Sequence, residues 1–233
     1  MILRRFRLVM VAKIIFLFTI SLLAQTQPGM PMAGSYTILV DGKPAGVERF
    51  EQAATAQNLI IKSTTEITSG GQAEKLTATT ELRGTKPVRY EMESSGGGRN
   101  QKYTLLFGGG VANVVIEAYG RRSERIIEVS EDVVLLDKNV WHHYVLLINR
   151  YNLNKRGAQS FPAITPQAGL RQYVAEVEYK DKTTFNAGGQ KLRANRFIVL
   201  QGDGYEAEVI ADESNRVLSI EVSALETKAV LQL

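Results

Sequence analysis

Short segments in which apolar and polar residues alternate, separated by glycine-rich turns, fill most of this 233-residue chain. Residues 88–93 (VRYEME) show the pattern well, and glycine triplets stand at 96–98 and 108–110. A period of two places successive side chains on opposite faces of a β-strand. About thirteen such segments predict a mainly β fold, either a curved antiparallel sheet or a (half-)barrel of about 12–14 strands. An outer-membrane barrel is the competing fold, which the charged outward positions of most strands disfavour.

One stretch departs from this alternation: residues 133–151, with the sequence VVLLDKNVWHHYVLLINRY, which holds the only tryptophan and both histidines. Its apolar residues recur at helical spacing, at Val140, Trp141, Tyr144, Val145, Leu147, Ile148 and Tyr151. Asp137 and Asn139 are candidate N-caps, because their side-chain oxygens can accept from first-turn amides. The sequence therefore predicts one central amphipathic helix near residues 139–151, packed against the curved sheet or inserted into it.

The first 24 residues resemble a secretory signal. Four basic residues precede or interrupt the apolar stretch, namely Arg4, Arg5, Arg7 and Lys13. Small or apolar residues, Leu22 and Ala24, occupy the −3 and −1 positions of a cleavage site before Gln25. These features predict a signal peptide over residues 1–24 and a periplasmic or secreted protein.

The apolar run after Lys13 is shorter than the roughly 20 residues that span a bilayer, so no membrane span is expected after signal removal. An uncleaved anchor formed by residues 8–24 is the alternative, with the charge of Lys13 as a costly interruption. Residues 25–33 contain prolines and methionines without periodicity and are expected to be a flexible leader. Residues 34–233 are expected to form a single β domain.

Charge and cysteine content exclude several functions. The chain has 28 basic and 24 acidic residues, and removing the four basic residues of the predicted signal leaves 24 of each. A nucleic-acid partner requires a clustered basic surface, so none is expected. The chain has no cysteine. Disulfides, thiolate zinc sites and an acylated lipoprotein cysteine are therefore excluded.

The chain shows no motif that carries a known chemistry. The adjacent residues His142 and His143 diverge by about 100° on a helix and cannot readily chelate one ion. The HExxH, Walker-type and GxSxG patterns are also missing. We therefore expect no enzymatic activity, no catalytic residue, no metal and no cofactor, and interpret both histidines as surface or cap-proximal. A hydrolase using either histidine with a carboxylate such as Asp137 or Glu131 is the less favoured alternative.

The helix face is interpreted first as core. A second interpretation makes it the wall of a cavity that binds a hydrophobic ligand, and its candidate residues are Val140, Trp141, Tyr144, Leu147, Ile148 and Tyr151. Many inward strand positions are small, which leaves volume, at Ala78, Ala112, Ala118, Ala175, Ala194, Ala207 and Ala211. Each buried methylene of a ligand would gain about 0.8 kcal/mol.

The sequence thus predicts an exported binding or carrier module for a hydrophobic small molecule or a lipidated envelope protein. The alternative is a structural or protein-interaction module of the cell envelope with no ligand.

The opening hairpin carries a resemblance. Residues 34–50 match a G-x-Y-x-I-x-x-x-G-x-x-x-G-x-E-x-F pattern at Gly34, Tyr36, Ile38, Gly42, Gly46, Glu48 and Phe50. This hairpin, together with residues 133–152 and the GAQSFPAITP motif of residues 157–166, resembles exported β-rich bacterial domains of unknown function. That family implies no agreed activity and no catalytic residue. A curved sheet with an internal helix is more distantly similar to periplasmic lipoprotein carriers, at the level of fold alone.

Overall fold

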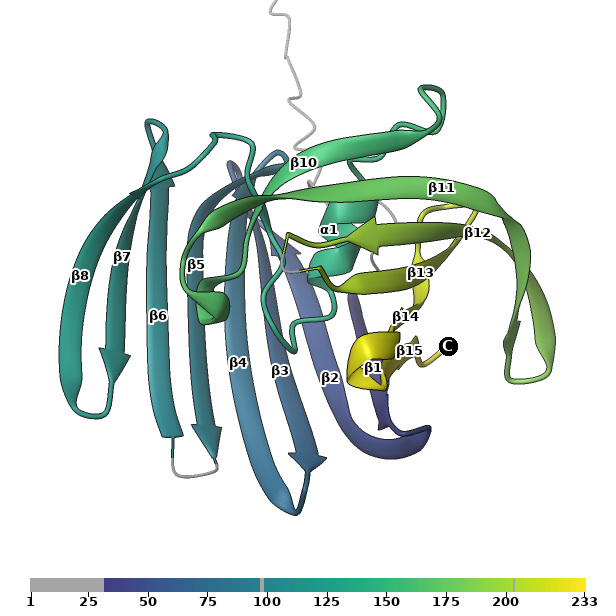
Figure 1. Ribbon diagram of the computed structural model, residues 1–233, viewed down its shortest axis with the longest axis horizontal. Coiled ribbons are helices and arrows are strands. Elements are labelled where there is room, and N and C mark those ends of the chain that lie inside the picture. The colour runs from purple at the N-terminus through teal and green to yellow at the C-terminus, as the bar shows by residue number, and fades with distance from the viewer. Residues whose placement is uncertain (1–31, 97–98, 203) are drawn as a thin grey trace, which may run out of the picture.

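The structure, a computed structural model, describes residues 32–96, 99–202 and 204–233 (Figure 1). The predicted signal peptide and most of the predicted leader lie outside these residues. The described chain forms 15 strands, which are β1 (Ala33–Val40), β2 (Lys43–Ala54), β3 (Leu59–Ser69), β4 (Gln72–Arg83), β5 (Lys86–Gly96), β6 (Arg99–Gly108), β7 (Val111–Ala118), β8 (Arg121–Glu128), β9 (Val134–Leu135), β10 (Ala158–Ile164), β11 (Gln172–Ala187), β12 (Gln190–Leu200), β13 (Glu206–Asp212), β14 (Val217–Val222) and β15 (Thr227–Leu231). One short helix, α1 (His143–Ile148), and two 3₁₀ turns, η1 (Pro166–Ala168) and η2 (Ser223–Leu225), complete the described elements.

All 15 strands belong to one open, curved sheet in the order β8-β7-β6-β5-β4-β3-β2-β1-β15-β14-β13-β12-β11-β10-β9. Neighbours pair antiparallel except β9 and β10, which pair parallel. The first and last strands pair with each other, so both described ends of the chain lie in the middle of the sheet. In Figure 1 the strands β3 to β8 run upright, and β11 to β13 run across the view. The mainly β fold class is confirmed, and the sheet does not close.

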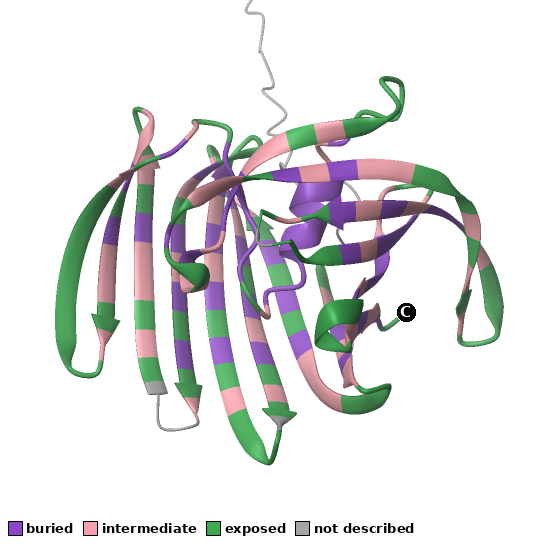
Figure 2. Cartoon of the chain, in the orientation of Figure 1, coloured by how far each residue is buried: buried purple, intermediate pink, exposed green. Residues whose placement is uncertain are grey.

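Helix α1 lies in the space that the bent sheet encloses (Figure 2). All six of its residues are buried. It shares one core cluster with β1, β3 and β12, as shown by Ile38, Ile61, Leu147 and Val199. A helix that is apolar all round is a core helix. The sheet therefore folds around this segment rather than presenting it at the surface.

The helix is shorter than predicted. Val140 and Trp141 precede it, and Tyr151 follows it after a turn, with the Tyr151 amide donating to the Ile148 carbonyl. Neither Asp137 nor Asn139 caps it, because the N-cap is His142, which makes no side-chain cap hydrogen bond. The predicted helix was too long because buried apolar residues continue on both sides of the helical residues.

Strands β9 and β10 were not predicted from the sequence pattern. The two residues of β9 pair with Ala163 and Ile164 of β10. Strand β10 contains Pro162, which breaks the apolar pattern. It pairs along its whole length with β11. The pairing of β9 with residues 29 positions away leaves no local periodicity to read.

The small inward residues lie where predicted. Six of the seven alanines are buried and Ala118 is half-buried. Four of them share a cluster with α1, namely Ala175, Ala194, Ala207 and Ala211. Ala78 and Ala112 pack in a second cluster with Val133, Leu135 and Val140. Most of the volume that these alanines leave is therefore filled by residues 133–148.

No helix among the described residues is long and apolar enough to cross a membrane.

Gly46 of β2 has no room for a side chain, because the backbone of β3 lies against it. A Cβ atom added there would lie 2.2 Å from the Glu66 carbonyl oxygen and 2.8 Å from the Ile67 Cα atom. Since both are backbone atoms, the strands must move, and we expect Gly46→Ala to lower the free energy of unfolding by about 1–3 kcal/mol. Gly108→Ala is the matched control, because nothing lies within 4 Å of its added Cβ. Urea denaturation of both variants tests this, and equal stabilities would contradict it.

Candidate functional site: a buried polar network beside a cavity

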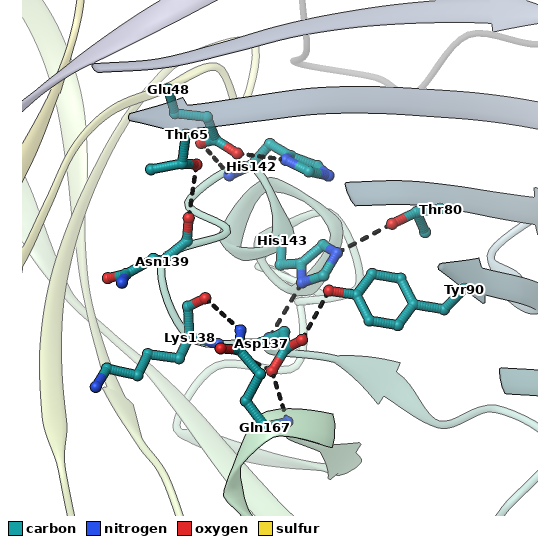
Figure 3. A network of polar contacts seen from close by, with 10 residues as sticks. All are labelled: Glu48, Thr65, Thr80, Tyr90, Asp137, Lys138, Asn139, His142, His143 and Gln167. Atoms are coloured by element: carbon teal, nitrogen blue, oxygen red, sulfur yellow. Dashed lines mark hydrogen bonds and ion pairs between the residues drawn. The ribbon is translucent and has the colours of Figure 1, made fainter. Parts of the chain in front are cut away.

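A buried carboxylate holds the chain just before α1 onto the sheet. Glu48 points inward from β2 because it shares the strand face of Phe50 and Gln52, which are also buried. Its Oε1 atom lies 2.8 Å from Nδ1 of His142, and its Oε2 atom accepts a hydrogen bond from the His142 amide at 3.1 Å. Both side chains are 0% exposed. One carboxylate thus satisfies two donors of the same residue (Figure 3).

His143 reaches the opposite way, toward β4. Its Nδ1 atom accepts a hydrogen bond from the amide of Asp137 at 3.1 Å, so the ring proton is on Nε2, which lies 3.0 Å from the Thr80 hydroxyl. Burial, and next the charge of neighbouring His142, lower the pKa of His143 well below 6.5. The imidazole is therefore neutral and acts as a buried hydrogen-bond bridge between Asp137 and β4.

Asp137 is the third buried group. The Tyr90 hydroxyl donates to its Oδ2 atom at 2.7 Å, and the amides of Lys138 and Gln167 donate to its Oδ1 atom at 3.1 Å each. Burial raises the pKa of Asp137 from 3.8 to about 6, although these three donors and the Gln167 side chain oppose the change. The carboxyl group therefore pays a desolvation cost whenever it is ionised.

Residues 136–142, here called the central loop, are tied to the sheet at further points. The Thr65 hydroxyl donates to the Asn139 carbonyl at 2.8 Å, and the Gln167 side chain donates to the Lys138 carbonyl at 2.8 Å. Asn139 has a left-handed backbone with φ of 60°, which its short polar side chain tolerates. The central loop is therefore held by β2, β3, β5 and η1, with His143 adding β4 at the start of α1.

The central loop forms one wall of a cavity of about 220 Å³. The cavity lies between this loop, α1, η2 and the chain that joins β12 to β13, and its lining residues are Leu136, Asp137, Lys138, Asn139, Val140, Trp141, Tyr144, Thr165, Ala168, Gln201, Tyr205, Val222, Leu225 and Thr227. The side-chain amide of Gln201 donates to the Tyr144 hydroxyl at 2.6 Å, which fixes two polar groups in the cavity wall. The cavity thus combines apolar walls with a few fixed polar groups, which is typical of ligand sites.

Half of the predicted cavity residues line this cavity. Val140, Trp141 and Tyr144 do so. Leu147 and Ile148 are fully buried in the core instead. The Tyr151 ring packs on Phe197, and its hydroxyl donates to the Gly157 carbonyl.

The two histidines are cap-proximal, as one half of the interpretation held, because His142 is the N-cap of α1 and His143 is its first residue. The other half, a surface position, is wrong, because both are 0% exposed. Neither histidine lines the cavity, and they point to different strands. Glu131, the other suggested carboxylate partner, is exposed and pairs with Lys86. The described residues contain no group of three or more His, Asp or Glu side chains placed to hold a metal ion.

Sequence reasoning missed the roles of Glu48, Thr80 and Tyr90. A local signal did exist, because each lies two residues from an inward apolar residue of its own strand: Phe50, Leu82 and Met92. Strand periodicity therefore predicts that all three point inward. What each would meet there depends on contacts across 47 to 94 positions, which no local pattern contains.

Comparisons with known proteins add little to this geometry. No model of a known protein family matches the sequence, and no curated protein is significantly similar to it. A crystal structure of a DUF1089 family protein from Pseudomonas aeruginosa is similar, with a TM-score of 0.49 and 12% sequence identity. The alignment covers 76% of this chain and 90% of that chain. At this level the similarity carries no argument about function.

Proposed function

We propose that this protein binds a small hydrophobic ligand in the cavity beside the central loop. The observation that carries the proposal is that apolar side chains line most of this space, chiefly Leu136, Val140, Trp141, Val222 and Leu225. Apolar walls of this kind favour transfer of an apolar ligand out of water by roughly 25 cal/mol for each Å² buried.

The volume limits the ligand. An engineered apolar cavity of about 150 Å³ binds benzene, whereas sites for drug-sized ligands begin at about 300 Å³. A cavity of about 220 Å³ therefore suits one ring or a short stretch of alkyl chain. A whole diacyl lipid would not fit, so a lipidated partner would place only the end of its chain here.

The geometry of the site supports two other hypotheses less well. A hydrolase needs a reacting histidine that substrate can reach, and both imidazoles are sealed in the core. A purely structural module needs no cavity, and it becomes the better account if no ligand binds. The export signal predicted from residues 1–24 would place binding in the periplasm or outside the cell, which fractionation of the producing cells would check.

The chain's single tryptophan makes the test direct, because Trp141 lines the cavity and gives one indole signal in a ¹⁵N–¹H NMR spectrum. We expect toluene and hexan-1-ol to shift that signal saturably. Val222 lines the cavity and is only 4% exposed, so the larger side chain of Val222→Phe should occupy the cavity. We expect this variant to bind the probes about tenfold more weakly or worse. Val174→Phe is the matched control at a position that is 61% exposed. If no probe shifts the indole signal, the proposal fails.

A further inference from the structure

Three aromatic side chains face the same cavity: Trp141 and Tyr144 from the chain around the start of α1, and Tyr205 from the segment before β13. The Trp141 and Tyr144 rings are nearly parallel, with an interplanar angle of 18° and centroids 6.5 Å apart. Aromatic faces carry partial negative charge and attract cations within about 6 Å. Several aromatic rings around one small space are the recurring way in which proteins recognise substituted ammonium groups.

The cavity also has a buried acid. Asp137 is only 5% exposed and lines the space. Hydrogen bonds from the Tyr90 hydroxyl, from the amides of Lys138 and Gln167 and from the Gln167 side chain reach its carboxylate, but none of these donors carries a positive charge. An ionised carboxylate taken out of water is stabilised by a cation placed close to it.

Among the described residues that line the cavity, Lys138 is the one cationic side chain. It is exposed, and Figure 3 shows it pointing away from the Asp137 carboxylate. An exposed charge is screened by water and salt, whereas a buried one is screened much less. The electrostatic preference inside the cavity is therefore set by Asp137 rather than by Lys138.

We propose that the ligand of this cavity is an organic cation, in which a substituted ammonium group is attached to a small apolar body. The aromatic faces and the Asp137 carboxylate would contact the charge, and the apolar walls would contact the body. This inference rests on the proposed function and names the ligand class of the same site.

The test compares the binding of three probes of similar size that differ in charge. Binding is monitored through the Trp141 indole signal and by calorimetry at about pH 8, where Asp137 is ionised. The probes are phenyltrimethylammonium, its uncharged carbon isostere tert-butylbenzene, and benzenesulfonate. We expect the cation to bind about tenfold more tightly than the isostere, a factor within the range of cation–π and charge pairing. The anion should bind most weakly.

Two substitutions assign the preference to particular groups. Asp137→Asn should cancel most of the advantage of the cation and leave binding of tert-butylbenzene nearly unchanged. Asp181→Asn removes the same charge from an exposed ion pair with Arg196 and should change nothing. Tyr205→Leu should weaken binding of the cation several-fold more than binding of the isostere, and Tyr205→Phe should restore it because it keeps the ring.

The outcomes separate the two proposals. Preference for the cation that Asp137→Asn removes supports both. Equal binding of cation and isostere, or stronger binding of the sulfonate, overturns the inference and leaves a hydrophobic ligand site. Absence of binding by all three probes overturns the inference together with the proposed function.

Discussion

Replacing Glu48 by alanine is expected to lower the free energy of unfolding by about 3–5 kcal/mol, because it removes one partner of a fully buried pair. The His142 amide and its Nδ1–H group would both lose their acceptor in a site that is 0% exposed. A buried donor without a partner costs far more than the net value of a typical hydrogen bond. Urea denaturation, followed by circular dichroism, measures the loss.

Glu51→Ala is the matched control, since Glu51 lies on the same strand and is exposed. It should change stability by less than about 0.5 kcal/mol. Glu48→Gln keeps one acceptor oxygen and should fall between the two. If Glu48→Ala and Glu51→Ala unfold at the same urea concentration, Glu48 does not anchor the central loop.

Asp137→Asn is expected to change how stability depends on pH. In the native protein the Asp137 carboxyl takes up a proton below about pH 6, whereas the unfolded chain does so only near 3.8. Between these values the native state binds more protons, so this group contributes stability that increases as the pH falls. Asparagine does not titrate. The stability of Asp137→Asn relative to wild type should therefore fall by about 2 kcal/mol between about pH 8 and pH 4.

Other groups near Asp137 do not disturb this comparison. His143 acts in the opposite direction, because its lowered pKa means that the unfolded chain gains a proton below about 6.5 and the native protein does not. That loss of stability on acidification is present in both proteins and cancels in the difference. Tyr90, Lys138 and Gln167 contact the carboxylate as donors and remain in place. Urea denaturation at a series of pH values gives the difference directly, and a value independent of pH would contradict the prediction.

This second result bears on function. A carboxylate whose ionisation weakens the fold at neutral pH is not explained by stability, and strongly shifted pKa values gather at functional sites. A residue kept for binding commonly costs stability, and its removal then stabilises the free protein. Asp137 fits that description because it lines the cavity. If Asp137→Asn is more stable than wild type at pH 8 and also loses the preference for cations, the same carboxylate both lowers stability and binds the cation.

Local sequence determined the class of this fold. Alternation such as VRYEME, closed by glycine turns, has one physical solution, an antiparallel sheet with one face buried. Apolar spacing likewise identified residues 139–151 as the segment that the sheet surrounds, and Trp141 is 5% exposed. Short-range steric and hydrophobic patterns were enough for these conclusions, because each needs only neighbouring residues.

The tertiary structure alone decided the site. Local patterns placed Leu147, Ile148 and Tyr151 on the same face as Trp141, but which of them meets empty space depends on how η2 and the segment around Tyr205 close over the central loop. The pairing of Glu48 with His142 joins residues 94 positions apart. Burial of these charges is tolerated because distant strands supply their partners. The local periodicity of the sequence does not determine which strands lie side by side, so it could not predict these partners.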